Sequence, residues 1–218
     1  MQGNASAGYC SVNDVRFMTN LATSDISDGD LYELIKMAAY QINSEIATEV
    51  VREKVLWLDD TRKNDINGTN TTYYVANWKG KYIADYDNDG DVDISDITVY
   101  AVYSDGTETE ATVSSITPDS GKFVLSSAYS SSYSLYVTYK WSYVSTYDPD
   151  KLVKLSCIYL AAAYAYAKIN VGKAPTAAFG NLKIYRDMNS FDKYYKRYQE
   201  IINTINDKML TYGESEVI

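Results

Sequence analysis

The sequence predicts an α+β protein, in which a helical core of three to four helices is split by a long antiparallel β insertion. Apolar residues recur at helical spacing near both ends of the chain, whereas β-branched and aromatic residues alternate with a period of two from Thr72 to Val144. A chain of 218 residues, 46% of them hydrophobic, is long enough to bury a core without disulfides or metal. We therefore expect N-terminal core helices in residues 1–60, an inserted β domain in residues 61–147, and C-terminal helices that complete the core domain in residues 148–218.

Two helices are expected in the first segment. Ser11 is a suitable N-cap for a short helix, because Val12, Val15 and Met18 follow it at helical spacing. A longer helix is expected from Leu31, after a polar segment rich in turn and cap residues. Its apolar residues recur at i, i+3, i+4 and i+7, which is the pattern of one buried stripe. The stripe comprises Leu31, Leu34, Ile35, Ala38, Ala39, Ile42, Ile46 and Val50.

The β insertion is expected to contain four to six antiparallel strands. Asp105-Gly106 is typical of a tight hairpin turn. Pro118 and Gly121 suit a second turn, because proline presets a negative φ and glycine accepts a positive one. The serine-rich run of residues 126–134 is expected to form a hairpin tip.

Helical spacing returns after the insertion. Asp148 and Pro149 suit the N-cap and first position of a helix whose residues 152–165 are apolar on nearly every face, so that helix should be buried on several sides. Gly172 is expected to end it. A last helix is expected from about Ser190 to about Leu210. Its packing side comprises Phe191, Tyr194, Tyr195, Tyr198, Ile201, Ile202, Ile205 and Met209.

The composition excludes several classes of site. The chain has no histidine, so a Ser-His-Asp or Cys-His nucleophile and a histidine-ligated zinc are impossible. Cys10 and Cys157 are far apart in the chain and form no CxxC motif; we expect both to be reduced, with Cys157 in the core. A net charge of −9 argues against a surface that grips DNA.

We expect a soluble protein that stays where it is made. Residues 1–8 lack the basic and apolar regions of a secretory signal. The longest apolar stretch, residues 158–167, is shorter than the ~20 residues that span a bilayer, so no membrane partner is expected.

One stretch carries the chemistry of a metal site. Residues 85–96 fit D-x-[DN]-x-[DN]-G with an acid at position 12, a pattern that curls hard oxygen ligands around a Ca²⁺ ion. Gly90 permits the bend, and Val92 is an apolar anchor to the core. Asp85, Asp87 and Asp89 are expected to be side-chain ligands. Asp91 is expected to offer its backbone carbonyl, Asp93 an oxygen that binds directly or through water, and Asp96 the closing carboxylate.

An acidic turn that needs no cation is the alternative for this stretch. Position 12 is Asp96 rather than glutamate, which makes bidentate closure less favourable. A signalling EF-hand is disfavoured, because residues 97–103 are β-branched where an EF-hand needs a helix. The stretch also resembles a dockerin calcium loop, but a dockerin has two tandem copies and this chain has one. The expected role of Ca²⁺ is structural: it would fix a β-hairpin.

The helical parts of the chain resemble the head–tail connector (adaptor, head-completion) proteins of tailed phages and related viruses. The resemblance covers the short helix at residues 9–16, the Asp- and Ser-rich cap at residues 24–31, and the long helix with its small residues and final Ile42-Asn43. It continues in the Leu- and Ala-rich helix at residues 149–169. It also includes residues 180–185, which lead into an amphipathic helix. The β insertion is far longer than the family requires.

This resemblance implies a non-enzymatic protein of the virion neck, made in the host cytoplasm. Such proteins form dodecameric rings below the portal, prolong the channel through which DNA passes without specific binding, and dock the stopper or tail-completion protein. Their C-terminal ends extend toward the portal. An acidic chain suits such a conduit, because DNA must slide through it. The Tyr-rich insertion suits a surface that contacts neighbouring subunits.

Three other functions stay open. A calcium-dependent binding module, dockerin-like or adhesive, would use the loop at residues 85–96, although it favours a second loop copy and a secretion signal. Another structural virion subunit, such as a tail-tube or capsid-decoration protein, is disfavoured by the helical halves. An enzyme that uses two carboxylates needs a specific pair, and nothing in the sequence singles one out.

Overall fold

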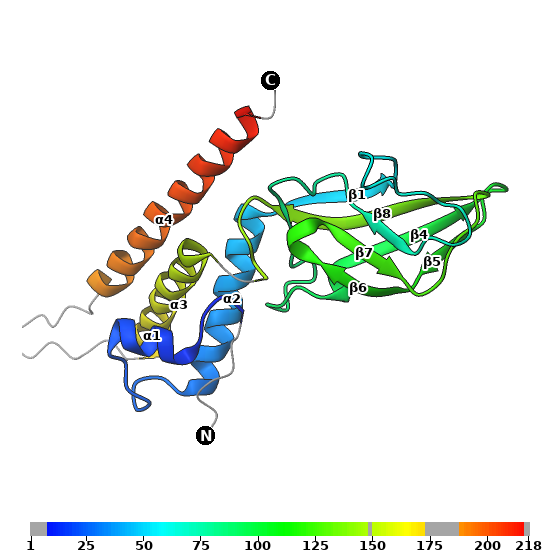
Figure 1. The fold of residues 1–218 in the computed structure, drawn as a ribbon. Coiled ribbons are helices and arrows are strands. Elements are labelled where there is room, and N and C mark those ends of the chain that lie inside the picture. Colours follow the sequence, from blue (N-terminus) through cyan, green and yellow to red (C-terminus); the bar gives the residue numbers. More distant parts are fainter. Residues whose placement is uncertain (1–7, 148–149, 173–187, 216–218) are drawn as a thin grey trace, which may run out of the picture. The chain divides into compact units, whose positions relative to one another are not determined.

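The computed structural model describes residues 8–147, 150–172 and 188–215. The chain divides into two compact units, which we call the helical unit (residues 1–45 and 151–218) and the sheet unit (residues 46–150). Within the described residues there are four α-helices and two antiparallel sheets, so the predicted mixed α+β class is confirmed (Figure 1).

The helical unit contains α1 (Val12–Thr19), α2 (Asp28–Ile46), α3 (Lys151–Gly172) and α4 (Met188–Ser215). Ser11 caps α1 as predicted. Its hydroxyl accepts a hydrogen bond from the Asp14 backbone N–H, while the Asp14 carboxylate accepts one from the Ser11 N–H. This reciprocal capping box satisfies two backbone donors that the first helical turn leaves open.

Helix α3 is central to the helical unit, and it packs against α4 and α1. Its small residues let neighbouring helices approach closely, and the fully buried positions include Val153, Leu160, Ala161, Ala162, Ala163 and Ala165. By length and composition Lys151–Asn170 is apolar enough to cross a membrane, as are core helices of soluble proteins; half of its most apolar stretch is buried within the structure.

Helix α2 ends earlier than the sequence pattern predicts. The apolar stripe was expected to continue to Val50, but Thr48–Lys54 forms strand β1 instead. Val50 therefore packs against the core of the sheet unit rather than the helical one. Because β1 pairs with β8 (Tyr133–Ser142), the sheet unit begins at Ile46 and not at the expected boundary after residue 60.

The other helix ends are close to those expected. Helix α3 ends at Gly172, and α4 extends beyond the expected Ser190 to Leu210 in both directions. The expected cap at Asp148 and Pro149, and the segment of residues 180–185, lie outside the described residues.

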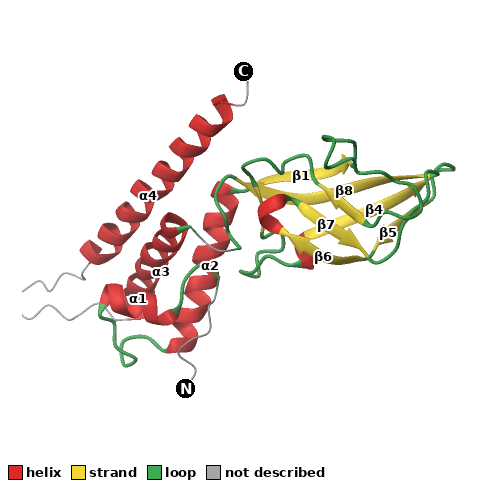
Figure 2. Ribbon diagram, viewed as in Figure 1, coloured by secondary structure: helices red, strands yellow, loops and turns green. Residues whose placement is uncertain are grey.

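The sheet unit has a five-stranded and a three-stranded antiparallel sheet (Figure 2). In the larger sheet the strand order is β1-β8-β4-β5, and β3 also pairs with β8. In the smaller one the order is β2-β7-β6. The remaining strands are β2 (Thr72–Tyr74), β3 (Tyr82–Ala84), β4 (Ile97–Tyr103), β5 (Glu108–Ala111), β6 (Val113–Thr117) and β7 (Lys122–Leu125).

Side chains from both sheets form one buried core. Alternate residues of β4 and β8 point into it, as the period of two predicts. They meet Tyr73 and Phe123 of the smaller sheet, whose rings stack at 5.7 Å. The fully buried members include Tyr73, Val75, Val99, Ala101, Phe123, Leu135, Val137 and Tyr139.

The turns agree with the sequence at two positions and differ at a third. Asp105-Gly106 joins β4 to β5, and Gly121 adopts a φ of +63° after the short helix η2 (Pro118–Ser120). The run 126–134 does not form the expected hairpin tip, because β7 before it and β8 after it belong to different sheets. The strands outnumber the expected four to six partly because β2 and β3 are only 3 residues each.

Candidate metal centre

The acidic loop, residues 85–96, joins β3 to β4 in the sheet unit. Both of these strands pair with β8, so the two ends of the loop are fixed to the same central strand. Between them, Val92 is 3% exposed and anchors the middle of the loop, as predicted for an apolar residue at position 8. The loop closes with a short helix, η1 (Ile94–Asp96).

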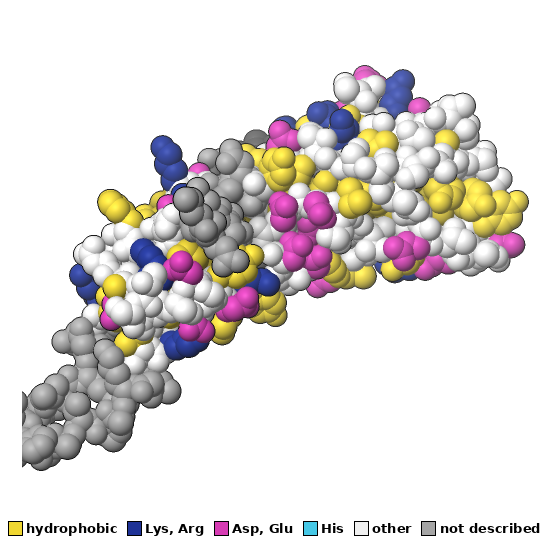
Figure 3. Space-filling model, turned by 90° about the horizontal axis from the view of Figure 1, so that it is seen from below, with side chains coloured by type: hydrophobic (Ala, Val, Ile, Leu, Met, Phe, Trp, Pro, Cys, Tyr) yellow, Lys and Arg dark blue, Asp and Glu magenta, His cyan; other side chains and the backbone are white. Residues whose placement is uncertain are grey.

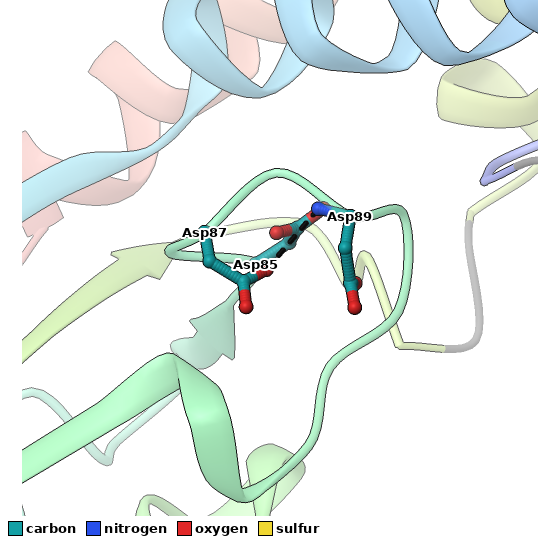
Figure 4. A group of neighbouring side chains, drawn as sticks. All are labelled: Asp85, Asp87 and Asp89. Atoms are coloured by element: carbon teal, nitrogen blue, oxygen red, sulfur yellow. Dashed lines mark hydrogen bonds between the residues drawn. The ribbon is translucent and has the colours of Figure 1, made fainter.

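Three carboxylates of the loop come together. One oxygen each from Asp85, Asp87 and Asp89 lies within 4.8 Å of the others (Figure 4). Ca²⁺ binds oxygens at about 2.3–2.6 Å, so two ligands of one ion lie at most ~5 Å apart. The spacing of the three carboxylates is therefore compatible with a single metal ion. Asp85 is buried, whereas Asp87 and Asp89 are exposed to solvent, from which an ion would enter.

Backbone hydrogen bonds hold Asp85 at the base of the cluster. Its carboxylate accepts the backbone N–H groups of Asn88 and Gly90, the latter at 2.9 Å. Gly90 has a φ of +94°, a conformation that glycine adopts without a Cβ penalty. The first carboxylate of the motif is thus linked to the glycine at its sixth position, and this bond curls the loop.

Each of the exposed acids Asp87 and Asp89 accepts a hydrogen bond from the backbone N–H of the residue two positions further along. The Asp87 carboxylate accepts the Asp89 N–H at 3.1 Å, and the Asp89 carboxylate accepts the Asp91 N–H at 2.9 Å. These are Asx-type turns, in which a side chain replaces a backbone acceptor. They orient successive carboxylates without using all of their oxygen lone pairs, so acceptor capacity is left for a cation.

The remaining predicted ligands are placed differently. The Asp91 carboxylate accepts the N–H of Val92, and the Asp93 carboxylate accepts both the N–H and the hydroxyl of Ser95, at 2.7 Å each. Asp93 therefore caps η1, and the bonds to Ser95 lower its pKa. Neither side chain belongs to the three-carboxylate cluster.

Asp96 closes the loop from inside. It is 1% exposed, and its carboxylate accepts the backbone N–H groups of Tyr86, Asp87 and Asp93, the last at 2.7 Å. These bonds tie position 12 to the start of the loop. Asp96 also lies close enough to Asp85 for their charges to repel, although it is outside the three-carboxylate cluster.

Burial and mutual repulsion raise the pKa of the two inner acids. Burial raises the pKa of Asp85 to about 6, against the opposing effect of its two N–H donors, and the charges of Asp87 and Asp89 add to the rise. Burial raises the pKa of Asp96 to about 7, with a contribution from Asp85. A divalent cation would reverse this effect, because an opposite charge favours the ionised form.

A positively charged side chain beside the loop was not predicted from the sequence. Lys140, on β8, donates from Nζ to the carbonyl of Tyr86 at 3.0 Å and contacts Asn88 Oδ1 at 3.4 Å. Its ammonium also lies 5.3 Å from the centroid of the Tyr86 ring. Only the strand register, which places Lys140 opposite Ala84, brings it here, and no local motif signals that register.

The acids of the loop contribute to the surface of the sheet unit. Asp87, Asp89, Asp91 and Asp93 are exposed. Figure 3 shows acidic side chains gathered densely on one face of this unit. Such a concentration of charge attracts cations from solution.

No protein-family model and no curated protein matches this chain.

Proposed function

We propose that this protein is a structural component of a virion, a head–tail connector that forms a ring below the portal, prolongs the DNA channel and docks the stopper or tail. The observation that carries the proposal is that two separate stretches of the chain form one helical unit. These are residues 1–45 and 151–218, and the sheet unit is inserted between them. The helical core is the part that resembles the connector family, and the sheet unit is the long insertion by which this chain departs from it.

The segments that resemble the connector family also supply the core of the helical unit. Residues 9–16 contain the capping box of α1, and residues 24–31 lead into α2. Residues 149–169 include most of α3, the helix that packs against both α1 and α4. The resemblance therefore falls on the residues that determine how this unit packs.

The helical unit also exposes large apolar side chains that a ring could bury. Phe17 on α1 is 86% exposed, and Met37 and Tyr40 on α2 are 57% and 58% exposed. Exposed aromatic and methionine side chains are typical of the central part of protein interfaces. The net charge of −9 is compatible with a channel wall along which DNA slides.

Light scattering on the full chain, alone and mixed with purified portal, tests the proposal. We expect a monomer that joins portal in a large complex whose mass corresponds to a ring. We expect Phe17→Ser to fold normally but to join portal poorly. Glu33→Ser, an exposed change on α2, is the control and should join as the parent does. A parent protein indifferent to portal would contradict the connector role and favour a calcium-dependent binding module or another virion subunit.

We also propose that the acidic loop binds Ca²⁺ as a structural ion. The three-carboxylate cluster offers hard oxygens at a suitable spacing, and Asp91, Asp93 and Asp96 are the further ligands that the motif implies. Bound Ca²⁺ would hold the segment between β3 and β4 in its curled form. This same cluster is the observation that favours the alternative of a calcium-dependent binding module.

Thermal unfolding in Ca²⁺ and in EDTA tests the metal proposal. At an ion concentration of about 100 Kd, binding adds roughly 3 kcal/mol, so chelation should lower the melting temperature by about 6–12 °C. The double change Asp87→Ala with Asp89→Ala should abolish that response. Glu110→Ala with Asp119→Ala is the matched control: it removes the same charge from exposed positions outside the loop and should keep the response. Identical melting curves in Ca²⁺ and EDTA would exclude the ion.

A further inference from the structure

The helical unit holds the two cysteines of the chain side by side in its core. Cys10 lies just before α1, and Cys157 lies in the second turn of α3; they are 2% and 0% exposed. Their sulfur atoms are 3.2 Å apart, with the Cys10 thiol donating toward Cys157. Both are free thiols.

We propose that Cys10 and Cys157 are a disulfide-forming site, which closes across the helical unit in an oxidising environment and opens again in a reducing one. Disulfide sulfurs are about 2.0 Å apart, so closure needs the two side chains to approach by only about 1 Å. Proximity of this kind between residues 147 positions apart in the chain reflects the fold and not local geometry.

The disulfide would join two chain segments whose only other covalent connection runs through the sheet unit. Cys10 belongs to residues 1–45, and Cys157 belongs to residues 151–218. A covalent link between them restricts the unfolded chain strongly, because the loop that it closes is long. The inference rests on the two thiols alone and does not depend on the proposed connector role.

The reaction is thiol–disulfide exchange with a small-molecule disulfide, such as glutathione disulfide. One cysteine thiolate attacks the oxidant, forms a mixed disulfide and releases one glutathione thiolate. The second cysteine thiolate then attacks the protein-bound sulfur and releases the other. The two cysteines lose two electrons and two protons, and the oxidant becomes two glutathione thiols.

The buried setting makes the site slow to react in the folded protein. The hydrogen bond to Cys157, together with burial, raises the pKa of Cys10, so little of the reactive thiolate is present at neutral pH. Exchange therefore requires the segment before α1 to open, or takes place before folding is complete. A protein made in a reducing compartment remains in the dithiol form.

The test uses the full chain, purified with reductant and then equilibrated with glutathione disulfide, alkylated in denaturant and analysed by mass spectrometry. We expect neither cysteine to be alkylated, because both are in the disulfide. The intact mass should be two hydrogens lower than that of the reduced protein, and the peptide map should show the peptides of Cys10 and Cys157 linked to each other. The melting temperature, followed by circular dichroism of the helices, should rise by about 5–15 °C and return when dithiothreitol is added.

Two variants serve as controls. Cys157→Ala and Cys10→Ala each leave a small side chain in the core and should show no rise of melting temperature with oxidant. Two alkylated cysteines in the oxidised parent, or linkage only between different molecules, would overturn the proposal. A melting temperature that falls on oxidation would also overturn it, because the site would then not accommodate the bond.

Discussion

At the scale of single residues, the chemistry of the acidic loop depends on two buried carboxylates. Asp85 and Asp96 each accept backbone N–H groups, and each has a raised pKa because burial disfavours its charge. The exposed acids Asp87, Asp89 and Asp93 contribute hydrogen bonds to the loop at the surface. Without a cation, the inner pair makes the loop less stable as it ionises.

The raised pKa values predict a decline of stability with pH in metal-free buffer. An acid that holds its proton more tightly when folded stabilises the fold fully below its unfolded pKa of 3.8, and this contribution is lost as the pH rises through about 6 for Asp85 and about 7 for Asp96. Between pH 4 and 7.5 in EDTA, we expect the parent to lose about 2 kcal/mol relative to Asp85→Asn, which does not titrate. Urea unfolding at both pH values measures this. Parallel pH dependences of parent and variant would contradict it.

The sequence motif predicted which acids form the loop better than it predicted how their side chains are arranged. Alternating aspartates with a glycine at position 6 predicted the curl of the loop, and three of the carboxylates gather as expected. The motif did not predict that Asp93 would bind Ser95, because either a metal or a helix N-terminus can use a carboxylate at that position. It could not predict Lys140, whose place depends on pairing with a strand distant in the chain.

At the scale of elements, the sequence predicted the helices and strands of the chain wherever one period dominated. Its main error was at the junction of α2 and β1, where Val50 continues the helical stripe by spacing but is drawn into the sheet by pairing with Tyr139. The second error was the run 126–134. In sequence, a polar loop between two strands is typical of a β-hairpin. A hairpin is excluded here only because the two flanking strands belong to different sheets.

Gly121 predicts a strong local requirement for glycine. Its φ is +63°, and a Cβ there would lie 2.8 Å from Val75 Cγ2 and 2.9 Å from Trp78 Cβ. We expect Gly121→Ala to cost roughly 2–5 kcal/mol, from the backbone conformation and the clash together. Gly106→Ala is the matched control: its φ is +91° but no atom lies within 4 Å, so the change should cost only roughly 1–2 kcal/mol. Denaturant unfolding compares them, and equal costs would show that the close contacts are unimportant.

The buried alanines of α3 predict a second difference between sites on one element. Ala162 is fully buried, so Ala162→Asp places an uncompensated charge in the helical core and should cost roughly 3–5 kcal/mol. Lys151→Asp changes an exposed residue at the start of the same helix, where a negative charge is favourable, and should be nearly neutral. Circular dichroism and denaturant unfolding measure both. A soluble Ala162→Asp variant that unfolds like the parent would mean that α3 is not packed as described.

At the scale of the whole molecule, the chain enters and leaves the sheet unit through neighbouring strands. β1 is the first strand and β8 the last, and Thr48 at the start of β1 lies opposite Trp141 near the end of β8. An inserted unit with adjacent ends interrupts its host unit little, because the chain returns to the place where it left. The core of the sheet unit is formed entirely by residues of the insertion, from Val55 to Tyr139.

These two features predict that residues 46–150 fold alone. The excised sheet unit keeps both sheets, their common core and the acidic loop, so we expect cooperative thermal unfolding and a strand-rich circular dichroism spectrum. If Ca²⁺ stabilises the loop in the full chain, it should raise the melting temperature of the excised unit by a similar amount, because β3, β4, β8 and Lys140 are all retained. Asp87→Ala with Asp89→Ala in the excised unit should remove that rise. An excised unit that is unfolded would show that residues 46–150 need the helical unit to fold, and a folded one without the calcium response of the full chain would place part of the ion site outside the insertion.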